Sequence, residues 1–208
     1  DLRPQELVDH ANGIARQARR ELTWFPGDGL RHTLSAAGEK VLLRNSISPQ
    51  PLHKALLLLE QIERDPLSRF TAHEKLALAK AVVGSASNLR FAPEASVVRA
   101  RDDAPVIDLW LQSVNAMAQD LQGVADCSGG IAQVFAGDAR RPGQMLQPNS
   151  IDAVITSPPY PNEKDYTRNT RLESVLLGFI RDRNDLRQVK EHLLRSNSRN
   201  IYTRDTDD

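Results

Sequence analysis

Cysteine is almost absent from this chain of 208 residues. Cys127 is the single cysteine, so no disulfide can form within the chain, and we expect a reducing, cytoplasmic location. No apolar run approaches the roughly 20 residues that cross a bilayer. Residues 1–4 lack the apolar core of a signal peptide. These absences argue against a disulfide-stapled secreted domain and against a membrane partner.

Excess charge of one sign is also absent, because 27 Lys and Arg balance 27 Asp and Glu. A net charge of zero argues against a chain that coats nucleic acid without specificity. The five histidines are scattered without metal-ligand spacing, so we predict no metal site. No internal repeat and no low-complexity segment occurs. With 40% hydrophobic and 26% charged residues, the composition is that of a globular domain with a real core.

The first 126 residues are predicted to be mainly helical. Ser48 and Pro49 form a typical helix start. Thr71 is predicted to cap another helix, with Glu74 completing a capping box. Residues 30–47 stay unassigned, and residues 88–94 are expected to be irregular. The expected helices, from apolar periodicity and these signals, cover residues 4–22, 52–64, 71–83 and 104–121.

Two short β-branched runs follow residue 126 and predict strands. Residues 131–135 come directly after a glycine pair, and residues 152–155 end at a double proline. In the second run, Val154 and Ile155 are expected to be the buried end of the strand. Neighbouring strands of this kind predict a mostly parallel sheet, whose carboxyl edge is where open α/β sheets bind ligands.

The Ser-Pro-Pro-Tyr tetrapeptide at residues 157–160 is the most informative motif. The prolines remove two backbone donors and fix φ, which leaves their carbonyls free to accept hydrogen bonds. Tyr160 offers a flat aromatic face. We infer a slot in which Ser157 and the Pro158 carbonyl accept hydrogen bonds from an exocyclic amine whose ring stacks on Tyr160. The plain alternative is a proline turn that leaves a core strand.

The motif and its upstream strand resemble the amino-methylating DNA methyltransferases. The resemblance runs from about Val134 to Tyr202 and includes the Gly-Asp-Ala-Arg segment at residues 137–140. It implies S-adenosylmethionine as cofactor, DNA as partner and a flipped target base, with cytosine-N4 favoured over adenine-N6 because the motif begins with serine. It also implies a role in restriction-modification or host defence.

The resemblance also implies which residues do the work. The catalytic set would be Ser157, Pro158, Pro159 and Tyr160. The cofactor-binding set, near the adenine, would be Gly137, Asp138 and Ala139. The residues proposed to bind nucleic acid, directly downstream of the motif, are Lys164, Arg168 and Arg171.

A local excess of positive charge favours that last group. Residues 164–204 contain ten Lys and Arg against five Asp and Glu, although the whole chain is neutral. Such an excess suits a phosphate backbone. The alternative is a solvated helix face with ordinary ion pairs.

The chain also departs from the family, because no glycine-rich loop that would cradle the methionine end of the cofactor occurs in it. We therefore expect an internal piece of a longer chain, completed by the rest of the polypeptide or by a partner subunit. Two alternatives stay open: an RNA amino-methyltransferase, and a noncatalytic nucleic-acid-binding module.

The predicted fold is α/β, a partial Rossmann-like methyltransferase sheet with a large helical N-terminal portion or insertion. Residues 1–126 would form the helical region, which would contact DNA or a partner. Residues 127–208 would form part of the catalytic core, ending in a basic helix. The target sequence and the oligomeric state do not follow from the sequence.

Overall fold

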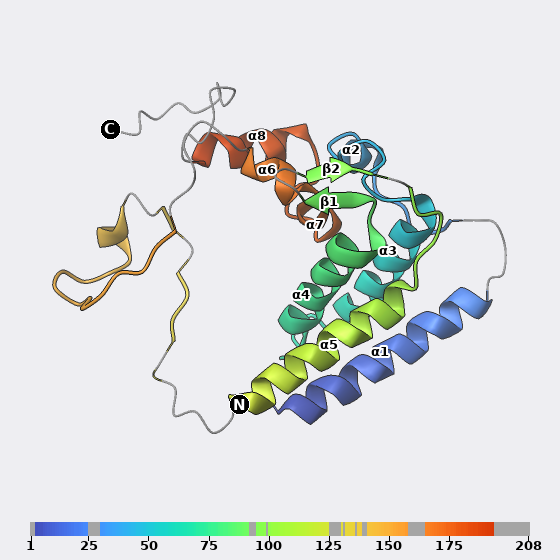
Figure 1. The fold of residues 1–208 in the computed structure, drawn as a ribbon, viewed down its shortest axis with the longest axis horizontal. Helices are drawn as coiled ribbons and strands as arrows, with labels where there is room; N and C mark the ends of the chain where they lie inside the picture. The colour runs from blue at the N-terminus through green and yellow to red at the C-terminus, as the bar shows by residue number, and fades with distance from the viewer. Residues whose placement is uncertain are drawn as a thin grey trace.

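The computed structural model divides into three parts, which are defined here by their residues (Figure 1). We call residues 3–124 the helical body, residues 130–157 the arm and residues 165–193 the C-terminal segment. The residues that the structure describes are 3–24, 30–91, 95–98, 100–124, 130, 132–135, 137–138, 141–157 and 165–193.

Helices dominate the described residues. In chain order the elements are α1 (Pro4–Trp24), α2 (Ala36–Glu39), α3 (Pro49–Glu63), α4 (Thr71–Ala81), the π-helical turn η1 (Val82–Ala86), β1 (Leu89–Phe91), β2 (Ala95–Val97), α5 (Val106–Gly123), the 3₁₀ turn η2 (Pro142–Gln144), α6 (Tyr166–Asn169), α7 (Arg171–Leu176) and α8 (Arg183–His192). The helices predicted at residues 4–22, 52–64, 71–83 and 104–121 are confirmed as α1, α3, α4 and α5. No helix among the described residues is both long and apolar enough to span a membrane.

Helices α1 and α5 lie side by side along one edge of the helical body, with the end of α5 near the start of α1 (Figure 1). The buried face of α1 is made of Leu7, Ala11, Ile14 and Ala18, which recur at helical spacing. Ala15 is buried on this face as well, beside Ala11 and Ala18. The short side chains of these alanines let a neighbouring helix approach closely. The amphipathic pattern in the sequence therefore determines which side of α1 faces the core.

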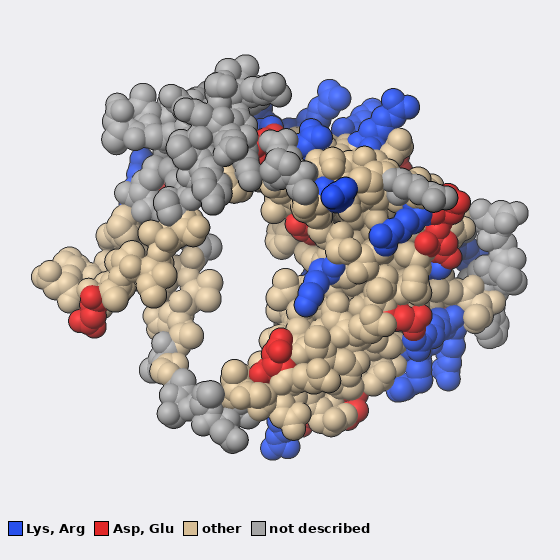
Figure 2. All heavy atoms as spheres, in the orientation of Figure 1, with Lys and Arg blue, Asp and Glu red and all other residues tan. Residues whose placement is uncertain are grey.

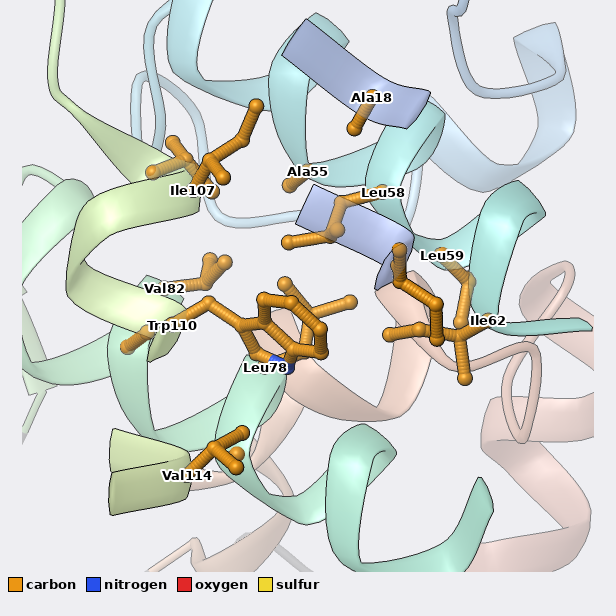
Figure 3. Close-up of a cluster of buried hydrophobic side chains, with 14 of the residues drawn as sticks. Ala18, Ala55, Leu58, Leu59, Ile62, Leu78, Val82, Ile107, Trp110 and Val114 are labelled. Carbon is orange, nitrogen blue, oxygen red and sulfur yellow. The ribbon is translucent and has the colours of Figure 1, made fainter. Parts of the chain in front are cut away.

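Trp110 of α5 lies at the centre of the core and is fully buried (Figure 3). Its ring packs among Leu78, Val82 and Val114, and its Nε1 donates a hydrogen bond of 3.0 Å to the backbone oxygen of Glu74. The indole therefore buries a large apolar surface without leaving its one donor unsatisfied. The same cluster draws residues from α1, α3, α4, α5 and α7.

The predicted capping box at Thr71 is wrong. Phe70 occupies the N-cap position without a side-chain cap, and the Thr71 hydroxyl donates to the Asp65 backbone oxygen at 2.9 Å. Glu74 instead points into the core, where its Oε1 lies 2.7 Å from Nδ1 of His10 on α1. A tertiary partner on α1 therefore overrides the local pattern.

Strands β1 and β2 form an antiparallel pair, called the hairpin below, so the prediction of an irregular segment at residues 88–94 is wrong over Leu89–Phe91. Strand β1 pairs antiparallel with β2, with Leu89 opposite Val97 and Phe91 opposite Ala95. Buried Asn88 holds the start of the hairpin: its Nδ2 donates to the Asn45 backbone oxygen at 3.0 Å, and its Oδ1 accepts from the Arg101 amide at 2.8 Å. One polar side chain thus ties three loops together.

The strands predicted at residues 131–135 and 152–155 are not confirmed where the structure describes them. Residues 132–135 and 151–157 have no regular secondary structure. They belong to the arm, which extends away from the helical body (Figure 1). Val154 and Ile155, predicted to be buried, are 78% and 99% exposed, and Val134 is 98% exposed. A strand needs neighbours to pair with, and these runs have none among the described residues.

The predicted Rossmann-like sheet is therefore not confirmed. The sheet in the described residues is the two-stranded antiparallel hairpin, so the fold is mixed α/β and mostly helical. The C-terminal segment packs onto the helical body, because Leu172 and Leu176 belong to the main core cluster. Residues that follow the predicted domain boundary at 126 thus share a core with residues that precede it.

Candidate functional site

The predicted site residues fall into two groups in space. Gly137, Asp138 and Ser157 lie in the arm, whereas Arg168 and Arg171 lie in the C-terminal segment on the helical body. The other predicted site residues lie outside the described residues: Ala139, Pro158, Pro159, Tyr160 and Lys164. The slot proposed between Ser157, Pro158 and Tyr160 thus stays a prediction.

Ser157 is exposed to solvent at the end of the arm. The preceding residues from Ile151 onward are exposed as well, so the hydroxyl is not sealed inside a core. An exposed hydroxyl can both accept and donate hydrogen bonds without a desolvation cost. This placement is compatible with a residue that contacts a ligand.

Gly137 and Asp138 stand at the start of a compact turn. A Cβ atom at Gly137 would collide with the Met145 sulfur, so a larger side chain there requires Met145 to move. The Asp138 backbone oxygen accepts a hydrogen bond of 2.9 Å from the Arg141 amide, and η2 follows. The close approach of Met145 therefore explains on structural grounds why a glycine suits position 137. The role of Gly137 in binding the cofactor stays a prediction.

Asp165 begins the C-terminal segment and is held on both sides. Its Oδ1 accepts from the Thr167 hydroxyl at 2.6 Å, and its Oδ2 accepts from Nζ of Lys190 on α8 at 2.9 Å. Burial alone would raise the pKa of this carboxyl, but the hydrogen bonds from Thr167 and Lys190 outweigh it and lower the pKa. Asp165 is therefore a charged anchor five residues after Tyr160.

Arg168 and Asn169 grip one residue of the hairpin. Nε of Arg168 donates to the Ala95 backbone oxygen at 3.1 Å, and the Ala95 amide donates to Oδ1 of Asn169 at 3.0 Å. The Arg168 side chain as a whole stays exposed to solvent. Its predicted role in binding nucleic acid is therefore sterically open and stays a prediction.

Arg171 has an internal role that the sequence did not indicate. Its guanidinium is buried and donates to the Thr167 backbone oxygen, the Thr167 hydroxyl and the Val41 backbone oxygen, each at 3.0 Å. Burial lowers the pKa of this guanidinium, while the charge of Asp165 opposes that shift. A guanidinium engaged in this way has little left to offer an external phosphate.

Three of the six described Lys and Arg residues downstream of the motif form ion pairs with acidic side chains. Arg181 pairs with Asp185 at 2.9 Å, Arg187 with Glu191 at 3.0 Å and Lys190 with Asp165 at 2.9 Å. Figure 2 shows Lys and Arg beside Asp and Glu on the face of the helical body that is in view. The alternative of a solvated helix face with ordinary ion pairs thus describes much of α8.

Two hollows open on the helical body, away from Ser157. One, of about 500 Å³, is lined by residues of the 30–52 region, including His32, Arg44 and Ser46. The other, of about 340 Å³, lies between the start of α1 and the end of α5. Over the described ranges, no group of three or more His, Cys, Asp and Glu is arranged to hold a metal ion.

Sequence reasoning missed Thr167 and Asn169, the polar side chains that complete the anchor of the C-terminal segment. Asn169 bonds to Ala95, which lies 74 residues earlier, so no local signal could have found it. Thr167 bonds to its neighbours Asp165 and Arg171, but threonine at this spacing is common and carries no specific signal. Comparison with known proteins gives no match: no family model, no curated protein and no solved structure matches this chain.

Proposed function

We propose that this chain is part of an S-adenosylmethionine-dependent DNA methyltransferase that methylates the exocyclic amine of a flipped base, with cytosine-N4 favoured over adenine-N6. One observation carries the proposal, the Ser-Pro-Pro-Tyr motif at residues 157–160, directly after the apolar run at 151–155. The solvent-exposed position of Ser157 and the anchored Asp165 downstream support it.

The role of the motif follows from the chemistry of the amine. An exocyclic amine is a poor nucleophile, because its lone pair is delocalised into the ring. Hydrogen bonds from its two protons to the Ser157 hydroxyl and the Pro158 carbonyl favour a pyramidal nitrogen with a free lone pair. Stacking on Tyr160 would return about 1–3 kcal/mol of the cost of taking the base out of the duplex.

The cofactor, when bound, supplies an electrophilic methyl group, and the protein's task is orientation. The described residues do not by themselves make up a site for it. Gly137 and the half-buried Asp138 are the described candidates, the space beside Gly137 is taken by Met145, and the sequence has no glycine-rich loop. We therefore propose that the cofactor cradle comes from another segment of the polypeptide or from a partner subunit.

The same partner would explain the exposed apolar residues of the arm. Val134, Val154 and Ile155 are β-branched residues of the type that pack in a sheet, yet they face solvent here. We propose that residues 132–135 and 151–155 become strands of a Rossmann-like sheet when neighbouring strands are supplied. The predicted Rossmann-like sheet is thus part of this proposal.

The test is methyl transfer from labelled S-adenosylmethionine to duplex DNA by the protein expressed from its whole gene. Ser157→Ala is expected to lower the transfer rate about 10²–10³-fold, as loss of one oriented polar contact does in other enzymes. Ser150→Ala is the matched control: its exposed hydroxyl bonds only to Gln147 within the arm, and we expect wild-type rates. Equal rates for wild type and Ser157→Ala would contradict the assigned role.

A noncatalytic nucleic-acid-binding module is the second candidate. It is favoured by the lack of a cofactor cradle and of a parallel sheet among the described residues. Absence of labelled cofactor binding, together with DNA binding, would support this module over the enzyme. Transfer to structured RNA and not to duplex DNA would favour an RNA amino-methyltransferase.

A further inference from the structure

The larger of the two hollows on the helical body plays no part in the proposed function. It has a volume of about 500 Å³ and lies between the segment before α2, the loop after α2 and the start of α3. Sites for small molecules have volumes of about 300–1,000 Å³, an apolar lining and a few polar groups that orient the ligand. Half of the lining residues here are apolar, namely Leu30, Leu42, Leu43, Ile47, Pro49 and Leu52. The hollow therefore has the size and the lining of a site for a small molecule.

Hydrogen bonds hold one wall of the hollow, the loop after α2, in a fixed conformation. The Ser46 amide donates to the Leu43 backbone oxygen at 2.9 Å, and the Ser46 backbone oxygen accepts from the Asn88 amide at 2.8 Å. Nδ2 of Asn88 donates to the backbone oxygen of Asn45, which has a φ of 61°. Asparagine tolerates this left-handed conformation better than most residues do. The wall is therefore shaped by the protein's own contacts.

His32 fastens the segment before α2 to two helices. Its Nδ1 lies 3.2 Å from Oε2 of Glu60 on α3, and its Nε2 lies 3.7 Å from Oε1 of Glu21 on α1. The His32 amide donates to Nδ1 of His53 on α3 at 3.1 Å. Both ring nitrogens of His32 thus face the protein's own carboxylates, so this histidine holds the segment in place and leaves ligand contacts to other residues.

Among the described residues that line the hollow, two charged side chains of opposite sign lack partners. Glu39 on α2 and Arg44 in the loop after it are exposed, and neither side chain forms an ion pair or a hydrogen bond within the described ranges. A carboxylate binds an ammonium group, and the planar fork of a guanidinium binds a carboxylate through two hydrogen bonds. The lining therefore favours a ligand that carries both an ammonium and a carboxylate.

Ser46 adds a buried hydroxyl to the lining. The residue is 2% exposed, and its Oγ has no hydrogen-bond partner among the described residues. Most buried hydroxyls in proteins have a partner, which is a protein group, an ordered water or a ligand. Rotation about a single bond moves this oxygen between three staggered positions, and a hydroxyl can both donate and accept. Either charged group of such a ligand would satisfy the Ser46 hydroxyl once it is turned toward the hollow.

We propose that the hollow binds a free α-amino acid with a large apolar side chain. The carboxylate of the ligand pairs with Arg44, and its ammonium pairs with Glu39. Its side chain packs against the apolar part of the lining, to which Leu42, Leu43 and Leu52 belong. Charges of both signs in the lining weigh against a ligand with a single charge, such as a fatty acid. No residue of the hollow belongs to the predicted methyltransferase site, so the two proposals are independent.

The test is an NMR titration of the protein expressed from its whole gene, with its leucine and isoleucine methyl groups labelled. The probe is L-phenylalanine, which carries both charges and a large apolar side chain. We expect shifts of the methyl signals of Leu42, Leu43 and Ile47, with a Kd on the order of 1 mM. The exposed Leu67 and Leu76, outside the hollow, should not shift. L-Serine, which lacks the apolar group, should bind at least about tenfold more weakly.

Two analogues and two variants test the assigned charge pairs. L-Phenylalaninamide lacks the carboxylate and N-acetyl-L-phenylalanine lacks the ammonium, so each should bind about three- to tenfold more weakly. Arg44→Gln should weaken binding of L-phenylalanine to the same degree and leave that of L-phenylalaninamide unchanged. Glu39→Gln should weaken binding of L-phenylalanine and leave that of N-acetyl-L-phenylalanine unchanged. Arg16→Gln and Asp120→Asn, matched changes at exposed residues outside the hollow, should bind like wild type.

Binding of L-phenylalanine with these charge dependences supports the amino-acid site whether or not the protein transfers methyl groups. Unshifted signals of Leu42, Leu43 and Ile47 at about 20 mM L-phenylalanine would overturn it. Equal Kd values for wild type, Arg44→Gln and Glu39→Gln would do the same, as would equal Kd values for L-phenylalanine and L-serine. Tighter binding of N-acetyl-L-phenylalanine than of L-phenylalanine would indicate a site for anions and would also overturn the assignment.

Discussion

Apolar side chains are buried in the helical body and exposed in the arm. Val82, Trp110 and Val114 of the body are buried, whereas Val134 and Ile155 of the arm are 98% and 99% exposed. The body succeeds because each amphipathic helix needs only neighbouring helices, which follow within the same 120 residues. The arm carries strand-type sequences, whose apolar residues become buried only once partner strands are present.

The largest expected effect separates the two regions by stability. Trp110→Ala should lower the free energy of unfolding by about 3–5 kcal/mol, because it empties the centre of the core and removes the indole donor to the Glu74 backbone oxygen. Ile155→Ala, in the arm, should change it by less than about 0.5 kcal/mol. Urea unfolding followed by circular dichroism measures both. A loss above about 1 kcal/mol for Ile155→Ala would mean that the arm is packed in solution.

Substitution of Asn88 tests whether contacts with the rest of the helical body stabilise the hairpin. Asn88→Ala should cost about 1–2 kcal/mol, because it removes the buried Asn88 side chain that bonds the Asn45 backbone oxygen and the Arg101 amide, both of which are only partly shielded from water. Asn115→Ala is the control, since this exposed side chain bonds only within α5, and we expect about 0.5 kcal/mol or less. The same urea titration applies. Equal costs for the two variants would contradict the bridging role of Asn88.

The pH dependence of the stability reports on the core of the helical body, through the buried carboxyl of Glu74. Burial raises the pKa of Glu74, although its hydrogen bond with His10 opposes that shift. At a pH between the ordinary value of 4.5 and the raised folded pKa, Glu74 is therefore protonated in the folded state and ionised in the unfolded state. The stabilisation from Glu74 is thus fully present below that pH and is lost as pH rises through the raised folded pKa.

Glu74→Gln should remove this dependence. The stability difference between wild type and Glu74→Gln should fall with a slope of at most about 1.4 kcal/mol per pH unit across that window. Unfolding midpoints collected from pH 4 upward measure it. A difference that rises with pH instead would show that His10 holds the carboxylate charged.

The smallest expected effect concerns the attachment of the C-terminal segment. The pKa of Asp165 is lowered, because the Thr167 and Lys190 hydrogen bonds outweigh its burial. Its stabilisation is therefore present above pH 3.8 and is lost as pH falls through the folded pKa. Asp165→Asn should cost about 1 kcal/mol or less at neutral pH, since the pair is partly exposed. If the difference in stability between wild type and Asp165→Asn does not change as the pH is lowered, Asp165 does not anchor the C-terminal segment as described.

The sequence predicts the helices of the body well because their signals are local. Ser48 and Pro49 lie at the start of α3, and the spacing of Leu7, Ala11 and Ile14 predicts the buried face of α1. The strands of the arm could not be judged in this way, because a β-branched run becomes a strand only when a distant segment pairs with it.

The same contrast between local and distant signals applies to the candidate site, whose motif stays a prediction from the sequence. A tetrapeptide motif can be recognised without knowledge of the fold, so Ser157 could be named from the sequence. The burial of Arg171 depends on the carbonyl of Val41, and nothing near residue 171 in the sequence signals that partner. The short hairpin was missed because Asn88, which organises it, acts through Asn45 and Arg101.

The contact between Arg171 and Val41 has a consequence for how the protein is made. The ribosome releases α1 to α5 well before residues 171–176, so the nascent helical body first emerges without Leu172 and Leu176 in its core. Contacts between residues so distant in sequence form late and slow folding. We therefore expect newly synthesised chains to expose that unfilled apolar face to chaperones until α7 arrives.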